Sequence, residues 1–146
     1  MLCTIDVNTE IRNNVRCTWI ECLYELSHLE YQKNLWIEAK YEGLVGDFWE
    51  SICTYFNDIN LEEGYRTWIE QGLISNQEFE IVREFHQNLD EYVEQTNKEN
   101  LSDLEILKDS RWHAIVAKAK NVWERMKNEV STKELEHMLA FEKNYN

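Results

Sequence analysis

The chain has no proline and only four glycines among its 146 residues. Because these residue types most often interrupt regular structure, long unbroken segments are expected, with turns concentrated between Gly43 and Gly72, where all the glycines lie. No apolar run approaches the ~18 residues of a membrane span. The N-terminus also lacks the basic-then-apolar pattern of a signal peptide. These absences predict a cytoplasmic protein that does not contact a membrane.

Signatures of metal sites, disulfides and common catalytic folds are missing as well. The four cysteines, Cys3, Cys17, Cys22 and Cys53, include no Cys-x-x-Cys pair, so we expect free thiols. The sequence holds no glycine-rich phosphate loop followed by lysine and no Gly-x-Ser-x-Gly elbow. We therefore assign no catalytic residue, no metal ligand and no cofactor.

Apolar and aromatic residues are abundant, and their spacing is helical. Hydrophobic residues make up 43% of the chain, including six Trp, seven Tyr and five Phe. This content is typical of one folded domain spanning residues 1–146. No segment alternates as a strand would. The prediction is an all-α, single-domain bundle of six or seven helices.

The expected helices follow from apolar periodicity and from N-cap signals. The predicted ranges are about 9–26, 29–38, 48–59, 76–95, 102–108, 110–126 and from 132 onward, with a single helical turn in 64–74 and a polar linker over 96–100. Serine followed three residues later by glutamate predicts capping boxes at Ser27, Ser75, Ser102 and Ser131, and Asp47 and Asp109 are expected N-caps. Ile11 and Leu44 are expected on buried faces. The helix over 110–126 should be the central one.

The negative charge is concentrated in the middle of the chain. Residues 41–107 hold 16 acids and three bases, a net charge of −13, whereas the two flanks hold 12 of each. A surface of this sign repels nucleic acid and anionic membrane and attracts a basic partner. We therefore expect a protein partner and no direct nucleic-acid binding.

One enzymatic alternative rests on two Glu-x-x-His matches, Glu25 with His28 and Glu134 with His137. In ferritin-like bundles such pairs hold two metal ions, because a three-residue step places both ligands on one helix face. Against this, the first pair spans the helix break expected at Ser27. With 22 glutamates and four histidines, one or two matches also arise by chance.

A set of segments from about residue 15 to residue 126 carries a family resemblance. They are Leu26-Ser27, Glu30-Tyr31-Gln32, Leu35-Trp36-Ile37, the aromatic and acidic stretch from Phe48 to Asp58, Ser75 to Glu78, and Asp109-Ser110-Arg111-Trp112 with Ile115-Val116 and Ala119. Together they resemble the immunity proteins of bacterial polymorphic-toxin and contact-dependent growth-inhibition systems. The resemblance implies an all-helical antidote, without enzymatic activity, that binds a cognate toxin domain. Because many such toxins are basic nucleases, an acidic inhibitor would partly mimic phosphate.

The predicted partner-binding residues lie at the start of the acidic segment. Trp49 stands one step from Phe48, about 100° round a helix, so it should be partly exposed beside acids. Interface energy concentrates on aromatic residues, while acids set association rate and specificity. The predicted set is Glu42, Asp47, Trp49, Glu50, Asp58, Glu62, Glu63 and Tyr65. An acidic adaptor for another basic protein is the remaining alternative.

Overall fold

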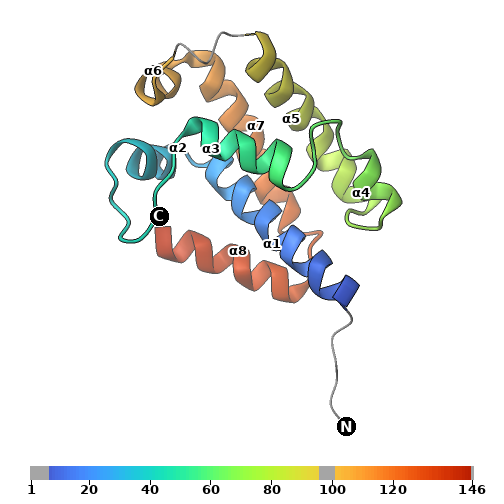
Figure 1. The fold of residues 1–146 in the computed structure, drawn as a ribbon. Helices are drawn as coiled ribbons and strands as arrows, with labels where there is room; N and C mark the ends of the chain where they lie inside the picture. The colour runs from blue at the N-terminus through green and yellow to red at the C-terminus, as the bar shows by residue number, and fades with distance from the viewer. Residues whose placement is uncertain (1–6, 96–100, 146) are drawn as a thin grey trace.

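Three long helices carry the core of the fold. In the computed structural model, which describes residues 7–95 and 101–145, these are α1 (Val7–Ser27), α5 (Asn76–Gln95) and α7 (Ser110–Met126). α7 packs against both α1 and α5, as Figure 1 shows. α7 is the central helix, as predicted, and seven of its residues are buried hydrophobics: Trp112, Ile115, Val116, Ala119, Val122, Trp123 and Met126.

Shorter helices surround this core. They are α2 (Leu29–Gln32), which continues into the π-helical turn η1 (Lys33–Ile37), α3 (Phe48–Cys53), which continues into the π-helical turn η2 (Thr54–Asp58), α4 (Arg66–Glu70), α6 (Asp103–Lys108) and α8 (Thr132–Tyr145). Within the described ranges there are eight α-helices and no strand. The all-α fold class is therefore confirmed, and the helix beyond the predicted six or seven is α4, which was expected as a single turn.

The π-helical turn η2 contains two adjacent aromatic residues that are both buried. In η2 the backbone bonds Ile59 N to Thr54 O at 3.3 Å and Leu61 N to Phe56 O at 2.9 Å span five residues instead of four. The wider turn changes which residues face inward, and both Tyr55 and Phe56 are buried. Regular helical spacing would direct them about 100° apart. π-turns of this kind are frequent at functional sites.

Most of the predicted N-caps are present. Both hydrogen bonds of the capping box form at Ser75 with Glu78 and at Ser102 with Glu105. The Asp47 carboxylate accepts a hydrogen bond from Glu50 N at 2.7 Å. Asp109 likewise caps α7 by accepting from Arg111 N at 2.9 Å. These local signals therefore set the helix starts correctly.

Several local predictions are wrong. Ser27 forms no capping box, because its hydroxyl donates to Tyr24 O and His28 occupies the N-cap of α2. Ile11 is 55% exposed, because the first turns of α1 extend beyond the core. Leu44 precedes α3 and is 38% exposed. The linker predicted over 96–100 lies outside the described residues.

Cysteine chemistry and membrane insertion can be checked over the described part of the chain. Cys17, Cys22 and Cys53 are free thiols, as predicted, and Cys3 lies outside the described residues. Across residues 7–95 and 101–145, no helix is both long and apolar enough to cross a bilayer.

Candidate functional site: an acidic groove beside α3 and η2

The helical segment from α3 through η2 forms a ridge with a buried side and an outward side. Phe48, Ile52 and Tyr55 recur at helical spacing and are 0 to 4% exposed. The ridge is held at its start by the Asp47 cap and by Phe48 N, which donates to Asp103 Oδ1 of α6 at 3.1 Å. The outward side therefore has a fixed position over the core, and Figure 1 shows α3 lying across α1.

A groove of about 480 Å³ runs between this ridge and the C-terminal half of α5. We call it the acidic groove. It is lined by Trp49, Ile52, Cys53, Phe56, Asn57, Glu62, Glu63, Asp90, Val93 and Glu94. Four of these residues are carboxylates and none is basic. The floor is apolar and the rim is negative, an arrangement that fits a basic segment with some apolar content.

The four carboxylates of the acidic groove have no ion-pair partner among the residues that the structure describes. In the part of the chain that the structure describes, Glu62, Glu63, Asp90 and Glu94 form no ion pair, whereas several other acids do. Asp90 and Glu94 are also four residues apart on α5, where like charges repel each other. The groove thus concentrates negative charge that no described basic side chain balances.

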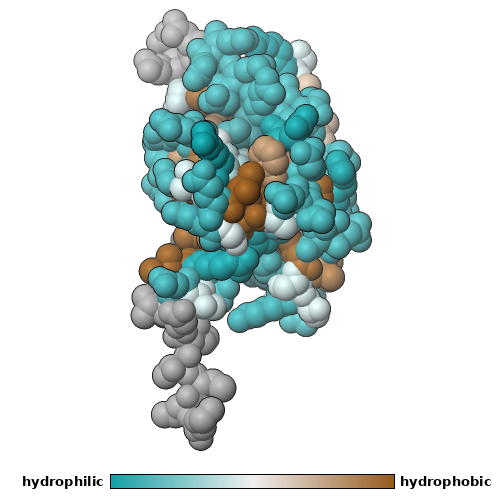
Figure 2. All heavy atoms as spheres, turned by 90° about the vertical axis from the view of Figure 1, so that its right-hand side faces the viewer, coloured by the Kyte–Doolittle hydropathy of each residue, from teal (hydrophilic) through white to brown (hydrophobic). Residues whose placement is uncertain are grey.

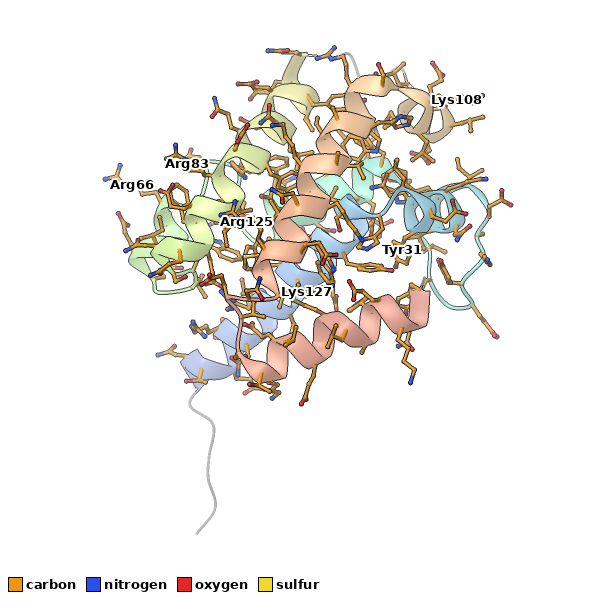
Figure 3. The ribbon with its side chains drawn as sticks, turned by 180° about the vertical axis from the view of Figure 1, so that it is seen from behind. Tyr31, Arg66, Arg83, Lys108, Arg125 and Lys127 are labelled. Atoms are coloured by element: carbon orange, nitrogen blue, oxygen red, sulfur yellow. The ribbon has the colours of Figure 1, made fainter. Side chains whose placement is uncertain are left out.

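Basic residues are present beside the N-terminal half of α5, next to the acidic groove. Arg66 and Arg83 lie there on one edge of the molecule, as Figure 3 shows, and they line a second depression that shares Glu63 with the acidic groove. They pair with Glu70 at 3.3 Å and with Glu80 at 3.7 Å, respectively. These exposed ion pairs bring that end of α5 close to neutral, in contrast to the acidic groove.

The side of the molecule that carries α4 and α5 is mostly hydrophilic. Figure 2 shows hydrophobic atoms on this side only in small patches surrounded by polar atoms. Large contiguous apolar patches commonly mark interfaces driven by hydrophobic burial. The surface seen in this view instead favours recognition by charge with a few apolar anchors.

The structure brings together three of the predicted partner-binding residues. Trp49, Glu62 and Glu63 line the acidic groove, and Trp49 is partly buried against the core, as its position beside Phe48 predicted. The other predicted acids are exposed but do not line the groove: Glu42, Asp47, Glu50 and Asp58. Asp47 also serves as the cap of α3, so its carboxylate already has a structural function.

The prediction that Tyr65 is a partner-binding residue is wrong, because Tyr65 is buried and cannot contact a partner at the surface. Its side chain is 2% exposed, and its hydroxyl accepts from Trp19 Nε1 at 2.7 Å and lies 2.8 Å from the Tyr55 hydroxyl. Two of the four carboxylates of the groove, Asp90 and Glu94, were not predicted to bind a partner. The sequence does show two acids four residues apart in this helix. It does not show that α5 packs beside α3, because that is a long-range contact which apolar periodicity does not reveal.

The two Glu-x-x-His pairs have other partners. Glu25 Oε2 accepts from Trp36 Nε1 at 3.1 Å, and Glu134 is bound by Arg16 at 2.8 Å. His28 Nε2 accepts from Lys120 Nζ at 2.9 Å, which requires an unprotonated imidazole. Over the described residues, no group of three or more His, Cys, Asp or Glu side chains is placed to hold a metal ion.

An all-α domain with an acidic groove is the class that the fold and the surface define. The chain belongs to the family described as a domain of unknown function, DUF7945, which matches residues 11–133. No curated protein and no solved structure matches the chain.

Proposed function

We propose that the protein is an immunity protein that binds and neutralises a cognate toxin domain through the acidic groove. The single observation that carries the proposal is the set of four groove carboxylates, none of which forms an ion pair with a described residue, beside the partly buried ring of Trp49. The sequence resemblance to immunity proteins supports the choice of a toxin domain as the partner. A basic nuclease is the toxin class that the sign of the groove fits best.

In this proposal, the charged residues and the apolar residue of the groove have different roles in binding. Glu62, Glu63, Asp90 and Glu94 would attract the basic surface that a nuclease uses to hold phosphates, and so raise the association rate. Trp49 would bury its remaining exposed ring face and slow dissociation. Occupying the phosphate-binding surface of the toxin would prevent substrate binding without any chemistry by the inhibitor.

The test is a titration of the toxin domain encoded next to this gene with the full-length protein, following binding and nuclease activity together. The double charge reversal Glu62→Lys with Glu94→Lys is expected to slow association at least tenfold at low salt and to release the nuclease from inhibition. The matched control is Glu129→Lys with Glu136→Lys, which reverses two exposed acids outside the groove.

Three outcomes would count against the proposal. If both double variants inhibit equally well, the groove is not the contact surface. If the wild-type protein binds no neighbouring toxin domain but co-purifies with another basic protein, the adaptor function replaces inhibition. About two metal ions per chain in protein from iron-supplemented cells would instead favour the metal-enzyme alternative.

A further inference from the structure

A second cavity, of about 310 Å³, lies on the opposite side of the α3–η2 ridge from the acidic groove. We call it the Glu25 cavity. One wall is a face of α1, where Glu21 and Glu25 are four residues apart, and Glu50 and Ser51 of α3 line another wall. Neither cavity shares a lining residue with the other. The ridge therefore separates two distinct sites.

The charge in the Glu25 cavity is negative. Glu21, Glu25 and Glu50 all line it, and no lysine, arginine or histidine does. Burial is the main cause that raises the pKa of Glu25, and the charges of Glu50 and Asp47 act in the same direction. A cation bound in the cavity would offset this electrostatic cost.

A buried hydroxyl in the same cavity has unused hydrogen-bonding capacity. Ser51 is only 6% exposed and lines the cavity, and its Oγ forms no well-oriented hydrogen bond with any residue that the structure describes. The hydroxyl lies near enough to the Glu25 carboxylate to oppose the rise in the pKa of that group. Buried hydroxyls in folded proteins nearly always have a partner, so a ligand that donates a hydrogen bond would complete this site.

The remaining walls are aromatic and aliphatic. Tyr31, Phe141 and Tyr145 contribute rings, and Figure 3 shows Tyr31 between α2 and α8. Leu44 and Val45 complete the lining, and Val45 is 84% exposed although it is aliphatic. A planar cation on an alkyl stem suits such walls, because a guanidinium stacks on aromatic rings while its methylenes cover apolar side chains.

We propose that the Glu25 cavity takes up the guanidinium group of an arginine side chain supplied by the partner protein, with Glu25 and Glu50 as charge partners and Ser51 as a hydrogen-bond acceptor. The inference rests on the proposed function, since it names one side chain of the same basic partner. A guanidinium fits better than an ammonium because its planar fork can bond a carboxylate and a hydroxyl while it stacks on a ring.

The test uses small probes with the full-length protein, so it does not depend on any toxin. N-butylguanidinium is titrated at pH 7.5 while two-dimensional NMR follows the amides of Glu25, Ser51 and Thr54, with the neutral isostere N-butylurea and with N-butylammonium as comparisons. We expect saturable shifts with the guanidinium, weaker ones with the ammonium and none with the urea. Binding should also lower the pKa of Glu25.

Two variants locate the site. Glu25→Gln keeps an oxygen that can accept from Trp36, and Glu50→Gln changes only an exposed side chain. Each is expected to weaken N-butylguanidinium binding about tenfold, as loss of a charge-assisted hydrogen bond predicts, whereas Glu62→Gln in the acidic groove should leave it unchanged. The proposal is overturned if the urea binds as well as the guanidinium, or if neither cavity variant weakens binding. If the protein inhibits the toxin but does not bind N-butylguanidinium, the inference about the Glu25 cavity is rejected and the proposed function is kept.

Discussion

Tyr65 shows how one buried hydroxyl fixes the protonation of a residue near the surface. An indole N–H can only donate, so Trp19 Nε1 donates to Tyr65, and the arrangement that gives every proton of the chain an acceptor has the Tyr65 hydroxyl donating to Tyr55. The Tyr55 hydroxyl in turn donates to His86 Nδ1 at 2.9 Å. His86 is therefore held as the neutral tautomer with its proton on Nε2. Protonating Nδ1 would reverse the chain and leave the Tyr65 proton without an acceptor.

The first prediction is that Tyr65→Phe destabilises the protein strongly although the ring is kept. The change leaves the buried Trp19 N–H and one Tyr55 hydrogen bond unsatisfied, and each such loss costs about 1–3 kcal/mol. Urea unfolding at pH 7.5 measures the difference. Tyr41→Phe is the matched control, because Tyr41 is only half-buried and its hydroxyl donates a longer bond of 3.3 Å to Tyr145 O. If the two variants lost the same free energy of unfolding, the hydrogen-bond chain from Trp19 to His86 would not contribute as proposed.

The second prediction concerns pH. Burial lowers the pKa of His86, with Asp90 opposing it, and burial also lowers the pKa of His28, with Lys120 acting in the same direction. The unfolded chain therefore binds more protons below pH ~6.5. Stability is fully present above that pH and falls as the pH drops toward the folded-state values, by at most about 1.4 kcal/mol per pH unit for each histidine.

His86→Gln tests the share of that loss due to His86. The glutamine oxygen can accept the hydrogen bond from Tyr55 without titrating. The free energy of unfolding of this variant should vary less between pH 7.5 and pH 5 than that of the wild type. An unchanged slope would mean that His86 takes up its proton equally in both states.

Arg16 joins helices that are far apart in the sequence. Arg16 is only 3% exposed. Its guanidinium donates hydrogen bonds to Glu78 of α5 at 2.7 Å, to Glu134 of α8 at 2.8 Å and to Leu73 O at 2.7 Å. Glu78 also completes the capping box of α5. The start of α5 and the start of α8 are thus both fixed to α1 through one side chain.

The third prediction is that Arg16→Ala is more damaging than removing the charge of Glu134. It leaves the buried Glu78 uncompensated, and breaking a buried pair in this way costs about 3–5 kcal/mol. Glu134→Gln keeps a hydrogen-bond acceptor on a side chain that is 20% exposed, so its cost should be about 1 kcal/mol. Urea unfolding of the two variants decides the order, and a smaller loss for Arg16→Ala would show that Arg16 does not couple the helices.

Element starts could be predicted from local spacing because caps are local. Ser75 and Ser102 form their boxes within four residues, and the sequence alone located them. At Ser131 only the hydroxyl bond to Glu134 N forms, since the Glu134 carboxylate is bound by Arg16 instead. Which distant residue takes a carboxylate depends on tertiary packing. The same limit hid the pairing of α5 with α3 that creates the acidic groove.

At the scale of the whole molecule, the charge imbalance of the sequence becomes a local imbalance on the surface. Of the 16 acids in residues 41–107, those with an ion-pair partner in the described chain include Glu70, Glu78, Glu80 and Glu84. The groove acids have no such partners in the described chain. Self-repulsion of this kind lowers the stability of a compact state, so a surface kept for binding should cost stability in the free protein.

The last prediction tests that cost. Neutralising the groove with Glu62→Gln, Glu63→Gln, Asp90→Asn and Glu94→Gln should raise the free energy of unfolding by roughly 0.5–1 kcal/mol in 20 mM salt, since each like-charge pair is worth roughly 0.2–0.5 kcal/mol. The gain should shrink at 0.5 M salt, because screening removes the repulsion in the wild type. The control neutralises four exposed acids elsewhere: Glu30, Glu38, Glu129 and Glu136. Urea unfolding at both salt concentrations gives the comparison. An equal gain in the control would make the effect one of total charge, whereas a gain confined to the groove variant would place the repulsion where the partner is proposed to bind.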